Sequence, residues 1–309
     1  MSARALIPFA LVAALALPGC GGSGGGGADA SGAARPGAGR PAVTFGTKVS
    51  PVSVLLGQLY AQALRAQGYA VALKEVVGDT PAAVSALHDG TVDAMPLPLD
   101  ALDDALGVPA RRAPSAAAAY ARGRAAAARR GLAVLQPTPF RAATALAVTP
   151  AFAQHRGVAS IADLARLPGL RLGASPGFFA RPAVGLAALR RIYGIRSLTY
   201  FPLTTGIQYR VLDAGKIDAA EVATTDGQLA GGKYRVLADP RHLFGFEQLA
   251  PVVPARVLAA EGPSFARTLD AVSARLTPRA MQQLSAAVVL AHGSPEQVAR
   301  DFLHAHGLA

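Results

Sequence analysis

Cysteine, tryptophan and long apolar runs are scarce in this chain, and their scarcity excludes several classes of protein. A single cysteine among 309 residues rules out an internal disulfide framework and any CxxC metal or redox site. Beyond the N-terminus no segment approaches the roughly 20 apolar residues of a membrane-spanning helix, which argues against a polytopic membrane protein. Hydrophobic residues still reach 51%, enough for a core, and the length favours two domains.

Acidic residues are also few, 19 against 30 lysines and arginines, which gives a net charge of +11. One 20-residue stretch holds six arginines and no acid: Arg111, Arg112, Arg122, Arg124, Arg129 and Arg130. Zinc-finger spacing, basic-region heptads and aromatic-basic RNA motifs are all missing. We therefore interpret the arginines as a solvated helix face and expect no nucleic-acid partner. The six histidines show no metalloprotease spacing, so no metal site is expected.

The N-terminus has the pattern of an export signal. Residues 5–17 form an apolar stretch of 13 residues, the length of a signal-peptide core. The sequence Leu-Pro-Gly-Cys that ends at Cys20 resembles a bacterial lipobox, whose cysteine is lipidated and becomes the first mature residue. We expect a lipoprotein signal peptide over residues 1–19 and a Gly-rich flexible tether over residues 20–42. The alternative is a secreted protein with an incidental cysteine.

From residue 43 onward the chain repeats its own pattern. Three pairs of segments recur at offsets of 127, 126 and 125 residues: 43–46 and 170–173, 77–80 and 203–206, and 91–94 and 216–219. Each half is predicted to run strand, helix, strand, helix, strand, which is typical of a parallel sheet covered by helices. The predicted fold class is therefore α/β with two similar lobes, and helices after residue 264 should pack back on one lobe. Ligands bind beyond the carboxyl ends of such strands, so loops from both halves are expected to face one cleft.

Two catalytic motifs are present but incomplete. Residues 173–177 (GASPG) fit the nucleophile-elbow pattern around Ser175, but Pro176 has no N–H to donate in an oxyanion hole. Residues 227–234 nearly match a P-loop, but Tyr234 replaces the Ser or Thr that holds magnesium. The chain is therefore not expected to be an enzyme or to carry a cofactor, and a lipoprotein hydrolase is kept only as an alternative.

The order and spacing of several segments resemble a known family. They are residues 43–48 (VTFGTK), 56–64, 87–96, 145–148, 172–182 (LGASPGFFARP), 223–228 (ATTDGQ) and 250–253, followed by the C-terminal helices. Over residues 43–309 the chain resembles the glycine betaine/choline/proline-type (osmoprotectant) substrate-binding proteins of ABC importers. The resemblance implies a bilobal, periplasmic-binding-protein-like type II (Venus flytrap) fold with two hinge crossings. It places one lobe at residues 43–143 plus 249–309 and the other at 144–248.

The resemblance also implies a set of ligand-binding positions. Family members commonly hold a quaternary ammonium between four tyrosines by cation–π attraction. Those positions fall on Pro98, Thr144, Ala223 and Glu247, and a carboxylate-binding threonine falls on Ala101. A shift of one residue would put Phe246 in the last position. The basic residues that grip the ligand's carboxylate are kept as Lys48 and Arg181, and Thr225 and Asp226 complete the candidate set.

These features predict a monomeric, exported solute-binding lipoprotein, anchored to the outer face of the bacterial cytoplasmic membrane. It would deliver a small zwitterionic or carboxylate ligand to an ABC permease that works with a separate ATPase. Since all four cage tyrosines are missing, an amino-acid-like ligand is favoured over choline or glycine betaine. A protein of the same fold that serves a sensor, another transporter or an unrelated ligand is the alternative.

Overall fold

The computed structural model describes residues 34–76, 78–108 and 113–309. The expected signal peptide and Cys20 lie outside the described residues. By their internal contacts, residues 35–309 form one compact unit. In the described part of the chain, no helix is both long and apolar enough to cross a membrane.

The strands of the first half, together with β10, form a two-stranded and a three-stranded sheet. The first consists of β1 (Val43–Thr47) and β2 (Val71–Glu75), and the second has the order β3 (Met95–Pro98), β10 (Leu249–Pro254) and β4 (Leu132–Val134). β1 pairs with β2 in parallel, and a parallel bridge between Phe45 and Ala94 joins β1 to the segment that enters β3. β10 is antiparallel to both of its neighbours.

The second half forms one continuous five-stranded sheet. Its strands are β7 (Leu198–Pro202), β6 (Leu170–Ala174), β8 (Ala219–Ala223), β5 (Thr144–Val148) and β9 (Arg235–Val236). β6 is parallel to β7 and β8, and β5 is antiparallel to β8 and β9. The α/β prediction is confirmed. The pairing is mixed rather than purely parallel. Among the described strands every antiparallel pair involves β5 or β10, the strand that follows each crossing of the chain from one half to the other.

The same pair of hydrogen bonds between an aspartate and a strand residue is found in both halves, and we call it the aspartate lock. Asp93 Oδ2 accepts from Thr44 N, and Asp218 Oδ2 accepts from Arg171 N, each at 2.8 Å. In return Asp93 N donates to the Thr44 carbonyl at 2.7 Å, and Asp218 N to the Arg171 carbonyl at 2.8 Å. Each lock ties the first strand of its half to the segment that leads into the third. The carboxyl ends of these two strands are thereby held at the same edge of each half.

Helices cover the sheets of both halves. Those of the first half are α1 (Pro51–Ala66), α2 (Thr80–His88), α3 (Leu99–Ala105) and α4 (Ala116–Ala128). The second half contains α5 (Pro150–Arg156), η1 (Ile161–Arg166), α6 (Pro176–Ala180), α7 (Leu186–Ala188), η2 (Leu189–Tyr193), α8 (Gln208–Asp213) and η3 (Gly227–Leu229). Several begin with a Ser or Thr cap followed by proline, as at Ser50, Thr149 and Ser175, where the hydroxyl accepts an N–H and proline has none to satisfy.

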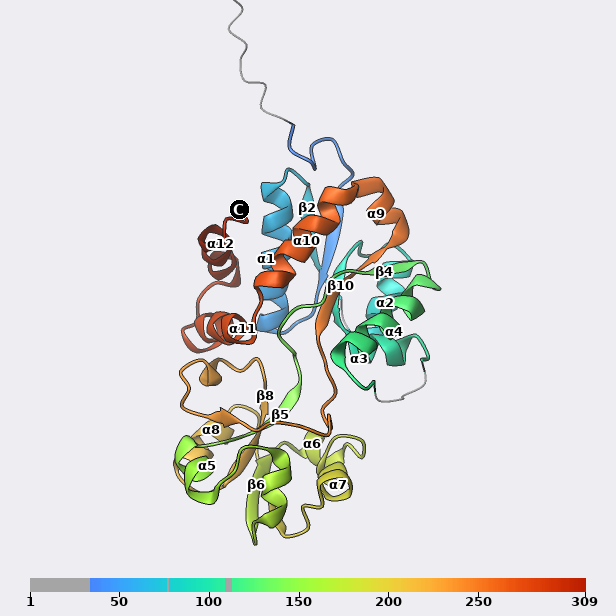
Figure 1. Ribbon diagram of the computed structural model, residues 1–309. Coiled ribbons are helices and arrows are strands. Elements are labelled where there is room, and N and C mark those ends of the chain that lie inside the picture. Colours follow the sequence, from blue (N-terminus) through green and yellow to red (C-terminus); the bar gives the residue numbers. More distant parts are fainter. Residues whose placement is uncertain (1–33, 77, 109–112) are drawn as a thin grey trace, which may run out of the picture. The chain divides into compact units, whose positions relative to one another are not determined.

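The C-terminal helices return to the first half, as the sequence predicts. They are α9 (Ala255–Glu261), α10 (Pro263–Arg275), α11 (Pro278–Ser285), η4 (Ala286–Leu290) and α12 (Pro295–Ala305). Figure 1 shows α10 and α12 beside α1, and both pack against it. Buried Tyr60 of α1 meets Ser273 of α10 with 2.9 Å between their hydroxyl oxygens. This packing makes the end of the chain part of the first half's core.

The two segments that connect the halves lie side by side. An antiparallel bridge joins Arg141 to Gln248, and Ala142 N donates to the Glu247 carbonyl at 2.9 Å. The predicted hinge positions, Thr144 and Glu247, lie at these segments. The residue boundaries assigned to the two lobes stay a prediction.

The residues just before β1 are packed, although the predicted tether extends to residue 42. Gly37 N donates to the Gln67 carbonyl at 2.9 Å, and Arg40 donates to the Ala260 carbonyl at 2.7 Å. A Cβ at Gly37 would come within 2.3 Å of Tyr69 N, so this glycine allows a close backbone contact. The packed part begins at Arg35, and the tether prediction applies only to the residues before it.

Candidate functional site

A cavity of about 230 Å³ lies at the carboxyl ends of β6, β7 and β8, beside the first residue of β5. We call it the strand-end cavity. Its polar lining includes Thr144, Ser175, Gln208, Glu221 and Asp226. Ligand pockets of proteins typically measure about 300–1,000 Å³, so this volume suits a very small solute.

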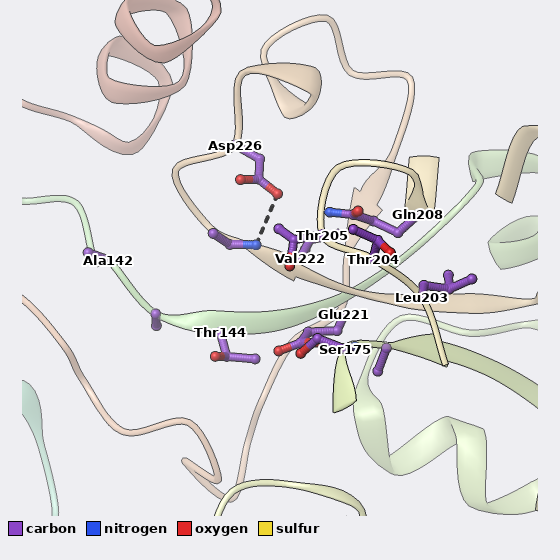
Figure 2. Close-up of a pocket in the computed structure, with 13 residues that line it drawn as sticks. Ala142, Thr144, Ser175, Leu203, Thr204, Thr205, Gln208, Glu221, Val222 and Asp226 are labelled. Carbon is purple, nitrogen blue, oxygen red and sulfur yellow. Dashed lines mark hydrogen bonds between the residues drawn. The ribbon is translucent and has the colours of Figure 1, made fainter. Parts of the chain in front are cut away.

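Glu221 is the best-connected side chain of the cavity. Its Oε2 accepts from the Ser175 N–H and from the Ser175 hydroxyl, each at 2.8 Å, and its Oε1 lies 3.3 Å from Arg181 Nη2. Figure 2 shows the Glu221 and Ser175 side chains next to each other. Arg181, the predicted grip for a ligand carboxylate, is therefore paired with a carboxylate of the chain itself.

Asp226 occupies a different part of the cavity wall. Its Oδ2 accepts from the Tyr209 hydroxyl at 2.7 Å and from Ala223 N at 3.1 Å, the latter drawn as a dashed line in Figure 2. Burial raises the pKa of the Asp226 carboxyl, and the charge of Glu221 adds to this. Asp226 also borders a second cavity of about 170 Å³, and Thr225 lies there rather than in the first.

Lys48 follows β1 and is held by the loop before α2. Its Nζ donates to the carbonyls of Gly78 and Asp79, the latter at 2.9 Å. Burial lowers the pKa of Lys48, and the negative charge of Asp79 opposes that shift. The structure does not bring Lys48 among the residues that line the strand-end cavity.

Pro98, Ala101 and Glu247 lie away from the cavity lining, around a group of acidic residues formed by Asp100, Asp104 and Glu247. Asp100 Oδ2 accepts from Phe246 N at 3.0 Å, next to Glu247, whose φ of +39° is unusual for a residue with a side chain. Burial, together with the charges of Asp100 and Asp104, raises the pKa of Glu247 to about 7, while Arg181 opposes this shift. The Phe246 ring packs on His242 with ring centroids 4.7 Å apart.

Of the predicted residues, the structure gathers Thr144, Ala223 and Asp226 at one cavity, with Arg181 attached to it through Glu221. Glu221 itself was missed. A signal was available, because it is the one charged residue in a strand that otherwise reads Ala-Ala-x-Val-Ala. Ser175 had been considered only as a nucleophile, whereas its hydroxyl donates to Glu221 and accepts from Phe178 N at 3.1 Å.

Comparisons with known proteins bear on what such a cavity does. The OpuAC model, described as the substrate binding domain of ABC-type glycine betaine transport system, matches residues 41–305. A glycine-betaine-binding protein of Pseudomonas aeruginosa is 32% identical over 282 residues, which cover 85% of this chain and 87% of the relative. The glycine betaine-binding protein YehZ of Escherichia coli K12 is 27% identical over 284 residues, 86% of this chain and 90% of YehZ.

Two solved structures superpose on most of this chain. Apo YehZ superposes with a TM-score of 0.76 at 26% identity, over 87% of this chain and 99% of that one. A glycine betaine/carnitine/choline ABC transporter structure gives 0.79 at 21% identity, over 86% and 99%. The predicted fold, a bilobal type II periplasmic-binding-protein fold with two crossings, is confirmed. The chain therefore belongs to the family of substrate-binding domains of ABC-type glycine betaine transport systems.

Proposed function

We propose that this protein is the extracytoplasmic solute-binding subunit of an ABC importer and that it captures a small zwitterion bearing a carboxylate. The observation that carries the proposal is the strand-end cavity, a small polar cavity at the carboxyl ends of three strands in a chain of this family. The solute would pass to a membrane permease driven by a separate ATPase. The lipobox at Cys20 supports anchoring of the protein to the membrane by lipid.

The chemistry of the cavity supports a cation that donates hydrogen bonds. None of the described residues that line it is aromatic. A trimethylammonium group, which has no N–H, would find no ring face there. A primary, secondary or tertiary ammonium would instead donate to Asp226 or Thr144, which line the cavity. We therefore propose an amino-acid-like or imino-acid ligand in preference to choline or glycine betaine.

A cation is needed for the ligand's carboxylate, and Arg181 is the candidate nearest to the cavity. It reaches the cavity through Glu221, and a guanidinium can bind a carboxylate through two parallel hydrogen bonds. Lys48 is the candidate from the first half of the chain. Its ammonium would have to exchange the loop carbonyls of Gly78 and Asp79 for the ligand.

A ligand screen with one variant tests this proposal. Glycine betaine, choline, proline and N,N-dimethylglycine would be added to the purified chain, and a ligand of the folded state raises its melting temperature. Losing one partner of a desolvated charge pair typically costs about 2–5 kcal/mol, so Arg181→Ala should weaken carboxylate binding by roughly 30-fold or more. Arg300→Ala, which removes the arginine of a surface ion pair with Glu296, is the control. Micromolar binding of choline that Arg181→Ala leaves unchanged would refute the proposal.

A further inference from the structure

The strand-end cavity contains its own carboxylate where the proposed function puts that of the ligand. Glu221 engages Arg181 through one oxygen and both donors of Ser175 through the other. The two bonds from Ser175, each 2.8 Å long, are charge-assisted hydrogen bonds, which are about twice as strong as neutral ones, and the Arg181 contact at 3.3 Å is a longer ion pair. The strongest donors at this end of the cavity are thus in use within the chain.

The described residues that line the cavity include no cation that could substitute for Arg181, which is itself not among them. Among the described residues that line the cavity, the charged ones are Glu221 and Asp226, and both are acidic. The Arg181 side chain is 48% exposed, whereas that of Glu221 is only 16% exposed. A carboxylate that approaches therefore meets a cation that a more deeply buried anion already neutralises.

We propose that Glu221 is a specificity-determining residue that competes with the ligand's carboxylate for Arg181. The inference rests on the proposed function. A ligand carboxylate can pair with Arg181 only if it displaces Glu221. The native site therefore prefers carboxylate-bearing cations over carboxylate-free ones, but by a smaller factor than an unpaired Arg181 would give. A variant without the Glu221 charge should then bind carboxylate-bearing ligands more selectively than the wild type does.

A matched pair of probes isolates this effect. N,N-dimethylglycine and N,N-dimethylethanolamine share a dimethylammonium group with one N–H, and they differ by a carboxylate in place of a hydroxymethyl group. Any change in attraction for the ammonium therefore cancels in the ratio of their dissociation constants, measured by calorimetric titration of the purified chain at pH 7.5. In Glu221→Gln the ratio should shift toward dimethylglycine by about tenfold or more, because the bond to Arg181 no longer has to be given up.

Two further variants sharpen the test. Glu296→Gln makes the same chemical change in the exposed pair with Arg300, whose atoms lie 2.7 Å apart, and should leave the ratio unchanged. Glu221→Asp keeps the charge but shortens the side chain by one methylene, which withdraws it from Arg181. Glu221→Asp should shift the ratio of dissociation constants in the same direction as Glu221→Gln. If the charge of residue 221 acted only by repelling the ligand's carboxylate through space, Glu221→Asp would leave the ratio unchanged.

The possible outcomes distinguish a failure of this inference from a failure of the proposed function. A shift in Glu221→Gln and Glu221→Asp, absent in Glu296→Gln, supports the competition. If the wild-type chain binds dimethylglycine and neither Glu221 variant changes the ratio, the competition is wrong and the proposed function stands. A shift in Glu221→Gln alone also overturns it, in favour of simple charge repulsion. If the wild-type chain binds neither probe, the proposed zwitterionic ligand class fails, and the inference fails with it.

Discussion

Gly185 holds the segment that carries Arg181, and Gly185→Ala should displace it. Gly185 N donates to the Arg181 carbonyl at 2.8 Å. A Cβ at this position would lie 2.0 Å from the Phe178 carbonyl oxygen and 2.6 Å from that of Arg181, where ordinary contacts begin at 3.4 Å. The first carbonyl would have to retreat by about 1.4 Å, and both are backbone atoms that cannot simply rotate away.

The cost follows from that displacement. Overpacking typically costs about 1–3 kcal/mol, and the strained hydrogen bond adds about 1 kcal/mol. A loss of about 3 kcal/mol corresponds to a fall of roughly 5 °C in melting temperature by scanning calorimetry, because unfolding residues 35–309 gains about 2.1 cal/mol/K of entropy per residue. Since the moved backbone is that of residues 178–181, carboxylate binding should weaken as well.

Gly177→Ala, in the preceding short helix α6, is the matched control. A Cβ there would meet only Ser175 Oγ, at 3.8 Å, which is an ordinary contact. Alanine is favoured over glycine in helices by about 1 kcal/mol, so this variant should melt at the same temperature or higher. Equal melting temperatures for Gly185→Ala and Gly177→Ala would refute the argument that the close carbonyl contacts determine the residue at 185.

Two other predictions concern pH and anchoring. The pKa of Glu247 rises from 4.5 to about 7 on folding, so below pH 4.5 the carboxyl is protonated in both states and Glu247→Gln should melt like the wild type. Between these two pH values the carboxyl ionises in the unfolded state before it does so in the folded state. Above pH 7 it is ionised in both states, and the folded state then carries the full cost of the buried charge. The variant should therefore be more stable than the wild type at pH 8 by about 3 kcal/mol; equal melting at pH 8 would contradict this. Cys20→Ser should release the protein from the membrane fraction, since several acyl chains anchor firmly where one is marginal; retention of the processed variant would disprove lipidation at Cys20.

The secondary structure was predictable where short apolar runs mark the strands and glycines mark the ends of strands and helices. Residues 170–173 were expected to form the first strand of the repeated pattern in the second half, and they lie in β6. The third strand of the first half was placed too early, at residues 91–94, whereas β3 begins at Met95. Residues 91–94 instead contain Asp93, which forms the aspartate lock with Thr44. The local sequence pattern of an extended segment that precedes a strand is the same as that of the strand itself, so the sequence could not separate the two.

The site was predictable only in part, because its contacts join residues far apart in the chain. Arg181 and Glu221 are 40 positions apart, and Lys48 lies 30 positions from Gly78. The family resemblance implied Thr144, Ala223 and Asp226 as ligand-binding positions, and all three line the cavity. Which charge pairs with which depends on the packing of the loops, and spacing along the sequence carries no information about that.

The two predicted carboxylate-binding cations are both engaged by the chain, and this follows from the cost of unpaired charge. A partly buried guanidinium or ammonium without a partner loses its hydration and gains nothing in return. Arg181 therefore pairs with Glu221, and Lys48 with two loop carbonyls. A ligand carboxylate at either residue would exchange one partner for another, so its affinity would reflect the difference between the two partners. Selectivity at such a site can be tuned through the internal partner, at Glu221, without any change to the cation that holds the ligand.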